Sequence, residues 1–90
     1  MEFEWDSAKR LANIAKHGLD FLAARSLFDG RASVTLPSTY ATETRLVSTA
    51  IMDDGKFYSV IWTLRGECRR IISYRRARDG ERREYRQVYG

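Results

Sequence analysis

Three β-rich stretches joined by tight turns place the strongest constraint on the fold of this chain. The stretches cover residues 43–52, 56–64 and 67–75. Asp53-Asp54-Gly55 is typical of a hairpin turn, with glycine where a positive φ is needed, and Arg65-Gly66 forms a second tight turn. Strands joined by such short turns pair antiparallel, so the sequence predicts a meander.

Two short helices precede the meander. Apolar residues at helical spacing, Leu11, Ile14 and Ala15, predict an amphipathic helix over residues 7–17, and a similar pattern predicts a second helix over 21–28. The residues expected to begin and end these helices are Asp6 and Gly18 for the first, and Asp20 and Gly30 for the second. Because only about two residues separate the helices, we expect a tightly packed helical pair.

The remaining segments complete the predicted fold. Charged and aromatic residues alternate over residues 2–5, which predicts a short first strand. Residues 32–36 predict another strand, which Pro37 is expected to end. A loop follows over 37–42, and residues 77–89 predict a final helix. The expected order is β-α-α-β-β-β-β-α, a single α+β domain over 1–90 with the helical pair on one sheet face. The other face stays open unless the last helix covers it.

Length and composition exclude several classes of protein. Ninety residues form one small domain, and no apolar run is long enough to cross a membrane. The single cysteine, Cys68, cannot form an internal disulfide and fits a reducing, cytoplasmic compartment. With one cysteine and one histidine we expect no metal and no cofactor.

The basic residues are concentrated in the C-terminal part of the chain. Residues 65–90 contain nine arginines and four acidic residues. The planar guanidinium suits phosphate and carboxylate groups, so a polyanionic partner is expected, either nucleic acid or an acidic protein.

The fifth strand carries many of these arginines. Uninterrupted alternation places Arg69, Ile71, Ser73 and Arg75 on one face, and Cys68, Arg70, Ile72 and Tyr74 on the other. Arginines beside apolar residues favour an anion-binding sheet surface. The alternative is that they are solvated or paired with acids of the same chain, such as Glu67, Glu81 or Glu84.

Three stretches resemble the BrnT family of type II toxins. The first is Phe3-Glu4-Trp5-Asp6 with Lys9, Asn13, Lys16-His17-Gly18, Phe21, Ala24 and Phe28. The others are Thr63-Leu64-Arg65-Gly66 and Arg70-Ile71-Ile72-Ser73-x-Arg75-Arg76-Ala77. The chain departs from the family at Tyr74, where a small residue is usual.

The resemblance implies a fold similar to RelE-type toxins and an endoribonuclease that stops translation by cutting RNA. It also implies a cognate antitoxin with a ribbon-helix-helix domain (BrnA-like). Operator DNA would be contacted only through that antitoxin.

Metal-free RNA cleavage requires a base for the 2′-hydroxyl, stabilisation of the phosphorane and a proton for the leaving oxygen. We expect Arg65, Arg70 and Arg75 to lie near one another and to stabilise the charge. His17 is the natural candidate for the general acid or base because its pKa is near neutral, although it could serve only the end of its helix. Tyr74 is a further catalytic candidate.

A second group of side chains is expected to bind RNA. Tyr58 and Trp62 could stack on bases, although aromatic residues of a central strand also form cores. The cationic members of the group are Lys16, Arg69 and Arg76. Cys68 is not expected to be a nucleophile, since no second histidine or acid pair is placed to activate it.

Two other functions fit the same sequence. An arginine-rich face could bind nucleic acid or an acidic protein without cleaving anything, in which case RNA would bind but not fragment. The open sheet face could instead serve only for dimerisation, and the isolated chain would then have no RNA affinity at low salt.

Overall fold

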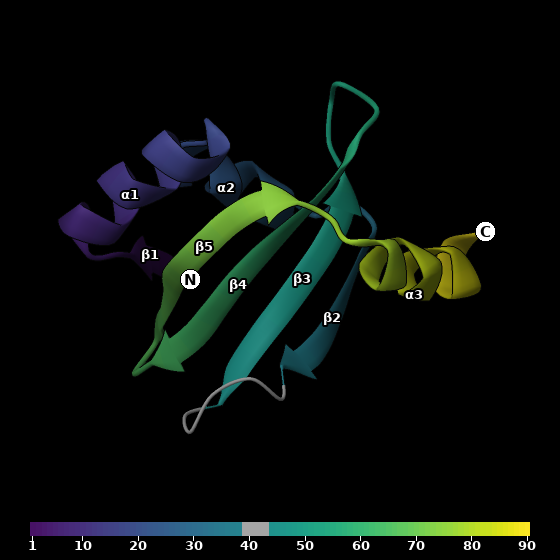
Figure 1. Ribbon diagram of the computed structural model, residues 1–90. Coiled ribbons are helices and arrows are strands. Elements are labelled where there is room, and N and C mark those ends of the chain that lie inside the picture. Colours follow the sequence, from purple (N-terminus) through teal and green to yellow (C-terminus); the bar gives the residue numbers. More distant parts are fainter. Residues whose placement is uncertain (39–43) are drawn as a thin grey trace.

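The computed structural model describes residues 1–38 and 44–90. Its elements in chain order are β1 (Glu2–Glu4), α1 (Ser7–His17), α2 (Phe21–Ala24), the 3-10 helix η1 (Arg25–Phe28), β2 (Ser33–Ser38), β3 (Arg45–Ile51), β4 (Phe57–Arg65), β5 (Cys68–Arg76) and α3 (Asp79–Tyr89). The strands form one sheet in the order β1-β5-β4-β3-β2 (Figure 1). The predicted α+β fold is confirmed.

Strands β2 to β5 form the predicted antiparallel meander. Gly55 and Gly66 have φ of 79° and 60° in its two turns, a conformation that favours glycine. The sequence did not indicate where β1 would lie. It pairs with β5 in parallel, opposite Cys68, Arg69 and Arg70.

Two segments differ from their predicted bounds. Strand β2 continues through Pro37 and ends at Ser38, because an edge strand tolerates the missing proline N–H. The second helical segment is α2 followed by η1. Most of the loop predicted over 37–42 lies outside the described residues.

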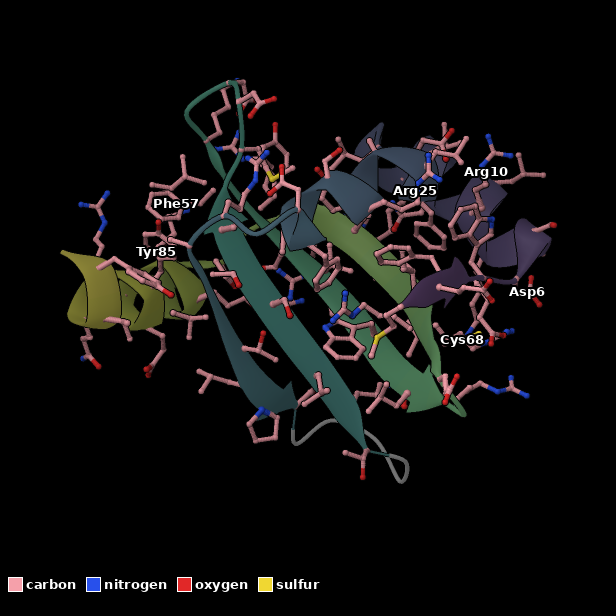
Figure 2. The ribbon with its side chains drawn as sticks, turned by 180° about the vertical axis from the view of Figure 1, so that it is seen from behind. Asp6, Arg10, Arg25, Phe57, Cys68 and Tyr85 are labelled. Atoms are coloured by element: carbon pink, nitrogen blue, oxygen red, sulfur yellow. The ribbon has the colours of Figure 1, made fainter. Side chains whose placement is uncertain are left out.

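The helical pair packs on one face of the sheet, as predicted. Seen from that side, α2 lies in front of the strands, and α1 lies beside them along the β5 edge of the sheet (Figure 2). Phe21 and Leu27 are almost completely buried against Val60 and Ile71 of the central strands. Strand β4 is covered on both sides along part of its length. The apolar core lies between β4, β5 and the helices.

Helix α1 does not bury its apolar stripe. Leu11 and Ile14 are 62% and 37% exposed, and the buried residue of this helix is Asn13. The cause is a set of polar contacts: the Asn13 side chain bonds to the backbone of Tyr74 in β5. The helix therefore packs through an amide and not through leucine and isoleucine.

Helix α3 docks at one end of the otherwise open face, beside β2 and β3 (Figure 1). Tyr85 is buried, with its ring centroid 5.3 Å from that of Phe57. Tyr89 donates from its hydroxyl to the carbonyl oxygen of Ser33 at 2.8 Å. Much of the β3-β4-β5 surface is left uncovered. No helix in the described part of the chain is long and apolar enough to cross a bilayer.

A β-bulge at Ile72 changes which arginines share a face. Ile61 pairs with Ser73 and Trp62 with Ile71, so Ile72 is an extra residue. The predicted uninterrupted alternation is therefore wrong. Arg69, Ile71 and Tyr74 belong to the helix-covered face, whereas the residues on the open face are Arg70, Ile72, Ser73 and Arg75.

Candidate functional site

Three connected hollows follow the open face of the sheet. The central hollow, about 300 Å³, is lined by Ser38, Arg45, Val47, Ile61, Ile72, Ser73, Arg75, Arg78 and Glu81. The turn hollow, about 480 Å³, is lined by Lys9, Thr44, Thr63, Leu64, Arg65, Arg70 and Ile72. The helix hollow, about 390 Å³, is lined by Val34, Leu36, Pro37, Val47, Thr49, Arg78, Gly80, Glu81 and Glu84. Shared lining residues join them into one trough.

Arg75 and Glu81 form a bidentate ion pair in the central hollow. The Nη1 and Nη2 groups of Arg75 donate to the two carboxylate oxygens at 2.8 and 2.9 Å. The same carboxylate accepts from the Arg78 backbone N–H at 2.9 Å and the Ser59 hydroxyl at 2.8 Å. Burial alone would raise the pKa of Glu81, but these bonds outweigh burial and lower the pKa to about 2. Glu81 therefore fixes Arg75 and anchors the start of α3.

The ion pair leaves one edge of the Arg75 guanidinium available. Nη1 also donates to the carbonyl oxygen of Arg76 at 3.2 Å, so three of the five N–H bonds are used. The Nε–H and the second Nη2–H make no hydrogen bond with any described residue. These two groups form a fork that matches two oxygens of a phosphate.

Asn13 anchors the end of α1, where His17 lies, and His17 is not among the residues that line the three hollows. One helical turn separates the two residues, and Asn13 donates to the carbonyl oxygens of both Leu19 and Tyr74. Burial, together with the positive charges of Lys16 and Arg75, lowers the pKa of His17 below its usual value. The imidazole is therefore neutral near pH 7 and can accept a proton.

The expected convergence of Arg65 and Arg75 is wrong. Arg75 pairs across the sheet with Ser59, six residues before Arg65 on the same strand. At a rise of about 3.3 Å per residue, roughly 20 Å separates the two positions. Arg65 lines the turn hollow and makes no ion pair with any described residue. Arg70 lies between them but bonds to Glu4 at 2.6 Å.

Arg69 lies on the opposite face of the sheet. Its guanidinium carbon is 3.8 Å from the ring centre of Phe28 and 4.4 Å from that of Trp62. The Nε atom is buried without a hydrogen-bond partner, and burial lowers the pKa of this arginine. Arg69 thus contributes to the aromatic core, away from the trough.

Several other predicted residues also lie outside the trough. Trp62 is buried and donates from its indole to Ser48, and burial raises the pKa of Tyr74 to about 12. Tyr58 donates to Asp54 at 2.6 Å, and Arg76 stacks over the Tyr58 ring. Lys16 is exposed beside His17. Their suggested contacts with RNA stay predictions.

Sequence reasoning overlooked several residues that shape the trough, namely Lys9, Asn13, Arg45, Ser59 and Arg78. Ser59 is fully buried within an apolar stretch of β4 and bonds to Thr49 as well as to Glu81. A small hydroxyl residue in a central strand was the signal available for it. For Asn13 the signal was a polar residue inside a helix with few strong apolar positions.

The described residues contain neither a group of metal-binding side chains nor an activated thiol. Within 1–38 and 44–90, no group of three His, Cys, Asp or Glu side chains is placed to hold a metal ion. Burial, followed by the charges of Glu4 and Glu2, raises the pKa of Cys68. The thiol is therefore protonated near neutral pH and is a poor nucleophile.

Residues 5–81 match the model of a family described as "Ribonuclease toxin, BrnT, of type II toxin-antitoxin system". The chain belongs to this family. The crystal structure of the Brucella abortus ribonuclease toxin BrnT superposes on it with a TM-score of 0.69 at 31% identity, covering 88% of this chain and 99% of the other. No curated protein sequence matches significantly. Membership of the BrnT family confirms the predicted endoribonuclease toxin, with RNA as substrate and a protein antitoxin as partner.

Proposed function

We propose that this BrnT toxin cleaves single-stranded RNA along the trough without a metal ion, and that the scissile phosphate lies in the central hollow. The observation that carries this proposal is the free Nε–Nη2 edge of Arg75. Glu81 holds the guanidinium in place on one side, so the other side can bind the two charged oxygens of a phosphorane. A donor fixed before the reaction stabilises developing charge without reorganisation.

His17 is the proposed proton acceptor for the 2′-hydroxyl. It lies at the end of α1, close enough to Arg75 for the arginine charge to lower its pKa. A neutral imidazole at pH 7 can remove the proton while the guanidinium stabilises the phosphate. Lys16, exposed next to His17, is the proposed proton donor for the leaving 5′-oxygen.

Cleavage of labelled RNA by the purified toxin in excess chelator tests this proposal. We expect fragments ending in a 2′,3′-cyclic phosphate, at the same rate with and without chelator. Loss of activity in chelator, restored by added metal, would contradict the metal-independent route. RNA binding without fragments would favour the non-catalytic binding module.

We also propose that a ribbon-helix-helix antitoxin neutralises the toxin in the cytoplasm by covering the trough, and that RNA cleavage inhibits translation. The exposed arginines of the open face would attract an acidic segment of such a partner. RNA binding should disappear when toxin and antitoxin are mixed before RNA is added. Retained RNA binding by the complex would show that the antitoxin lies elsewhere.

A further inference from the structure

The turn hollow contains two cations that have no partner in the described chain. Lys9 comes from the first turn of α1 and Arg65 from the end of β4, and both are exposed. We propose that Lys9 and Arg65 form a separate phosphate-binding subsite, which holds the RNA backbone several nucleotides away from the cleaved bond. This inference rests on the proposed function and extends it to substrate length.

The composition of the hollow fits a phosphate group. Three cationic side chains line it, and no acidic side chain does so among the described residues. Arg70 bonds to Glu4 through one Nη1–H, which leaves other N–H groups of its guanidinium unused. Thr63 donates to the carbonyl oxygen of Thr44, and both polar residues line the turn hollow. The hollow therefore offers donors and positive charge to an anion.

Lys9 occupies a position that does not favour helix stability. It is the third residue of α1, where the helix dipole disfavours a positive charge, and no acidic residue lies in this first turn. The lysine side chain has no ion pair with any described residue to compensate. A binding role explains a cation at this position better than a contribution to the fold.

The separation between the hollows sets the requirement on the substrate. About 20 Å lies between the strand positions of Arg65 and Arg75, by the strand rise of roughly 3.3 Å per residue. One phosphate cannot contact both residues, and a dinucleotide is too short to reach from one hollow to the other. Ile72 lines both hollows, so a longer strand can pass continuously between them.

The test compares a double variant, K9A/R65A, with a charge-matched control, R25A/K56A. Arg25 in η1 and Lys56 in the β3–β4 turn are exposed and line none of the three hollows. For an RNA of twenty or so nucleotides, K9A/R65A should raise KM about tenfold or more, with a far smaller change in kcat. The slope of log affinity against log salt should fall by about 0.7 for the lost phosphate contact. Cleavage of a dinucleotide should be the same for wild type and K9A/R65A.

A charge reversal separates binding from folding. Lys9→Glu places an acid in the first turn, so it should raise the melting temperature slightly while weakening RNA binding. Parallel losses of stability and binding would overturn the subsite, as would a KM equal to that of R25A/K56A. A fall in kcat with unchanged KM would mean that these residues act on the reacting phosphate. That result would also overturn the proposed subsite. If Arg75→Ala still abolished cleavage, the proposed function would survive; wild-type toxin that neither bound nor cut RNA would end both proposals.

Discussion

The side-chain amide of Asn13 pairs with the backbone of Tyr74 in the way that a neighbouring strand would. Nδ2 donates to the Tyr74 carbonyl oxygen at 2.8 Å, and Oδ1 accepts from the Tyr74 N–H at 3.1 Å. Strand β1 is short and pairs with Cys68, Arg69 and Arg70, so no strand of the described residues lies beside this part of the β5 edge. One amide therefore joins α1, the helix that ends at His17, to the sheet.

Replacing Asn13 by leucine should destabilise the protein by about 2–4 kcal/mol, because a buried N–H and a buried carbonyl lose their partners. Chemical denaturation of the variant measures this loss. Leu11→Ala on the exposed side of the same helix is the control and should stay within about 0.5 kcal/mol of wild type. Equal effects of the two substitutions would show that the amide has no special role.

Glu81→Gln should lower kcat for RNA cleavage about tenfold while KM changes little, because Arg75 loses its charged partner and its fixed orientation. Steady-state kinetics on a labelled RNA provide both parameters. Glu84→Gln is the matched control, since Glu84 also lines the helix hollow but makes no ion pair with the described residues. An unchanged kcat in a destabilised Glu81 variant would reduce Glu81 to a structural residue.

The stability of the protein should depend on pH through Glu81. The folded-state pKa of about 2 lies below the usual value of 4.5, so the stabilisation is complete above about pH 5 and is lost as pH falls toward 2. The contribution at neutral pH is on the order of 3 kcal/mol. Asp20 and Asp29 also have pKa values of about 2, so the informative quantity is the difference between wild type and Glu81→Gln. That difference should shrink on acidification; a constant difference between pH 6 and pH 2.5 would contradict the ion-pair account.

His17 should control the acidic limb of the pH–rate profile. Its lowered pKa means that kcat/KM should rise with pH through a value below 6.5 and level off near neutrality. Lys16→Ala should move the histidine pKa upward, because a nearby positive charge is removed. Nuclear magnetic resonance can follow the single histidine directly. His17→Ala should eliminate the limb, and an unchanged profile would exclude His17 as the proton acceptor.

Arg75→Lys should reduce kcat by about 10²- to 10³-fold despite keeping the charge, because an ammonium cannot bind Glu81 and a phosphate through two forks at once. Single-turnover cleavage at saturating enzyme isolates this effect from binding. Arg83→Lys, an exposed position of α3 outside the three hollows, should behave like wild type. Comparable activity of Arg75→Lys and wild type would show that charge alone suffices.

The elements of the fold were predictable because their signals are local. Asp6 caps α1 and Gly18 ends it with a φ of 70°, both as the sequence indicated. The parallel pairing of β1 with β5 was not predictable, since it joins segments more than sixty residues apart with no short connection. The burial of Asn13 was also missed, because periodicity finds apolar stripes and cannot show an amide that replaces a strand.

The candidate site was predicted less completely than the fold. The charge of Arg75 does act on the pKa of His17, but the strand rise places Arg65 in a different hollow. Trp62 and Arg69 proved to pack against each other in the aromatic core. The predicted faces of the β5 residues were wrong beyond Ile72, because the sequence contains no clear signal for one extra residue in a strand.

The extra residue in β5 decides which side of the sheet the residues after it face. With Ile72 accommodated as the extra residue, Tyr74 lies opposite Val60 and Arg75 opposite Ser59. Deleting Ile72 would keep these pairs and these faces, because the remaining residues already alternate regularly. A strand of the present length that paired without the bulge would instead turn Tyr74 to the open face and Arg75 to the core. A relative with one residue fewer at this position can therefore display the same arginine surface, so a gap in an alignment here does not by itself signal a different surface.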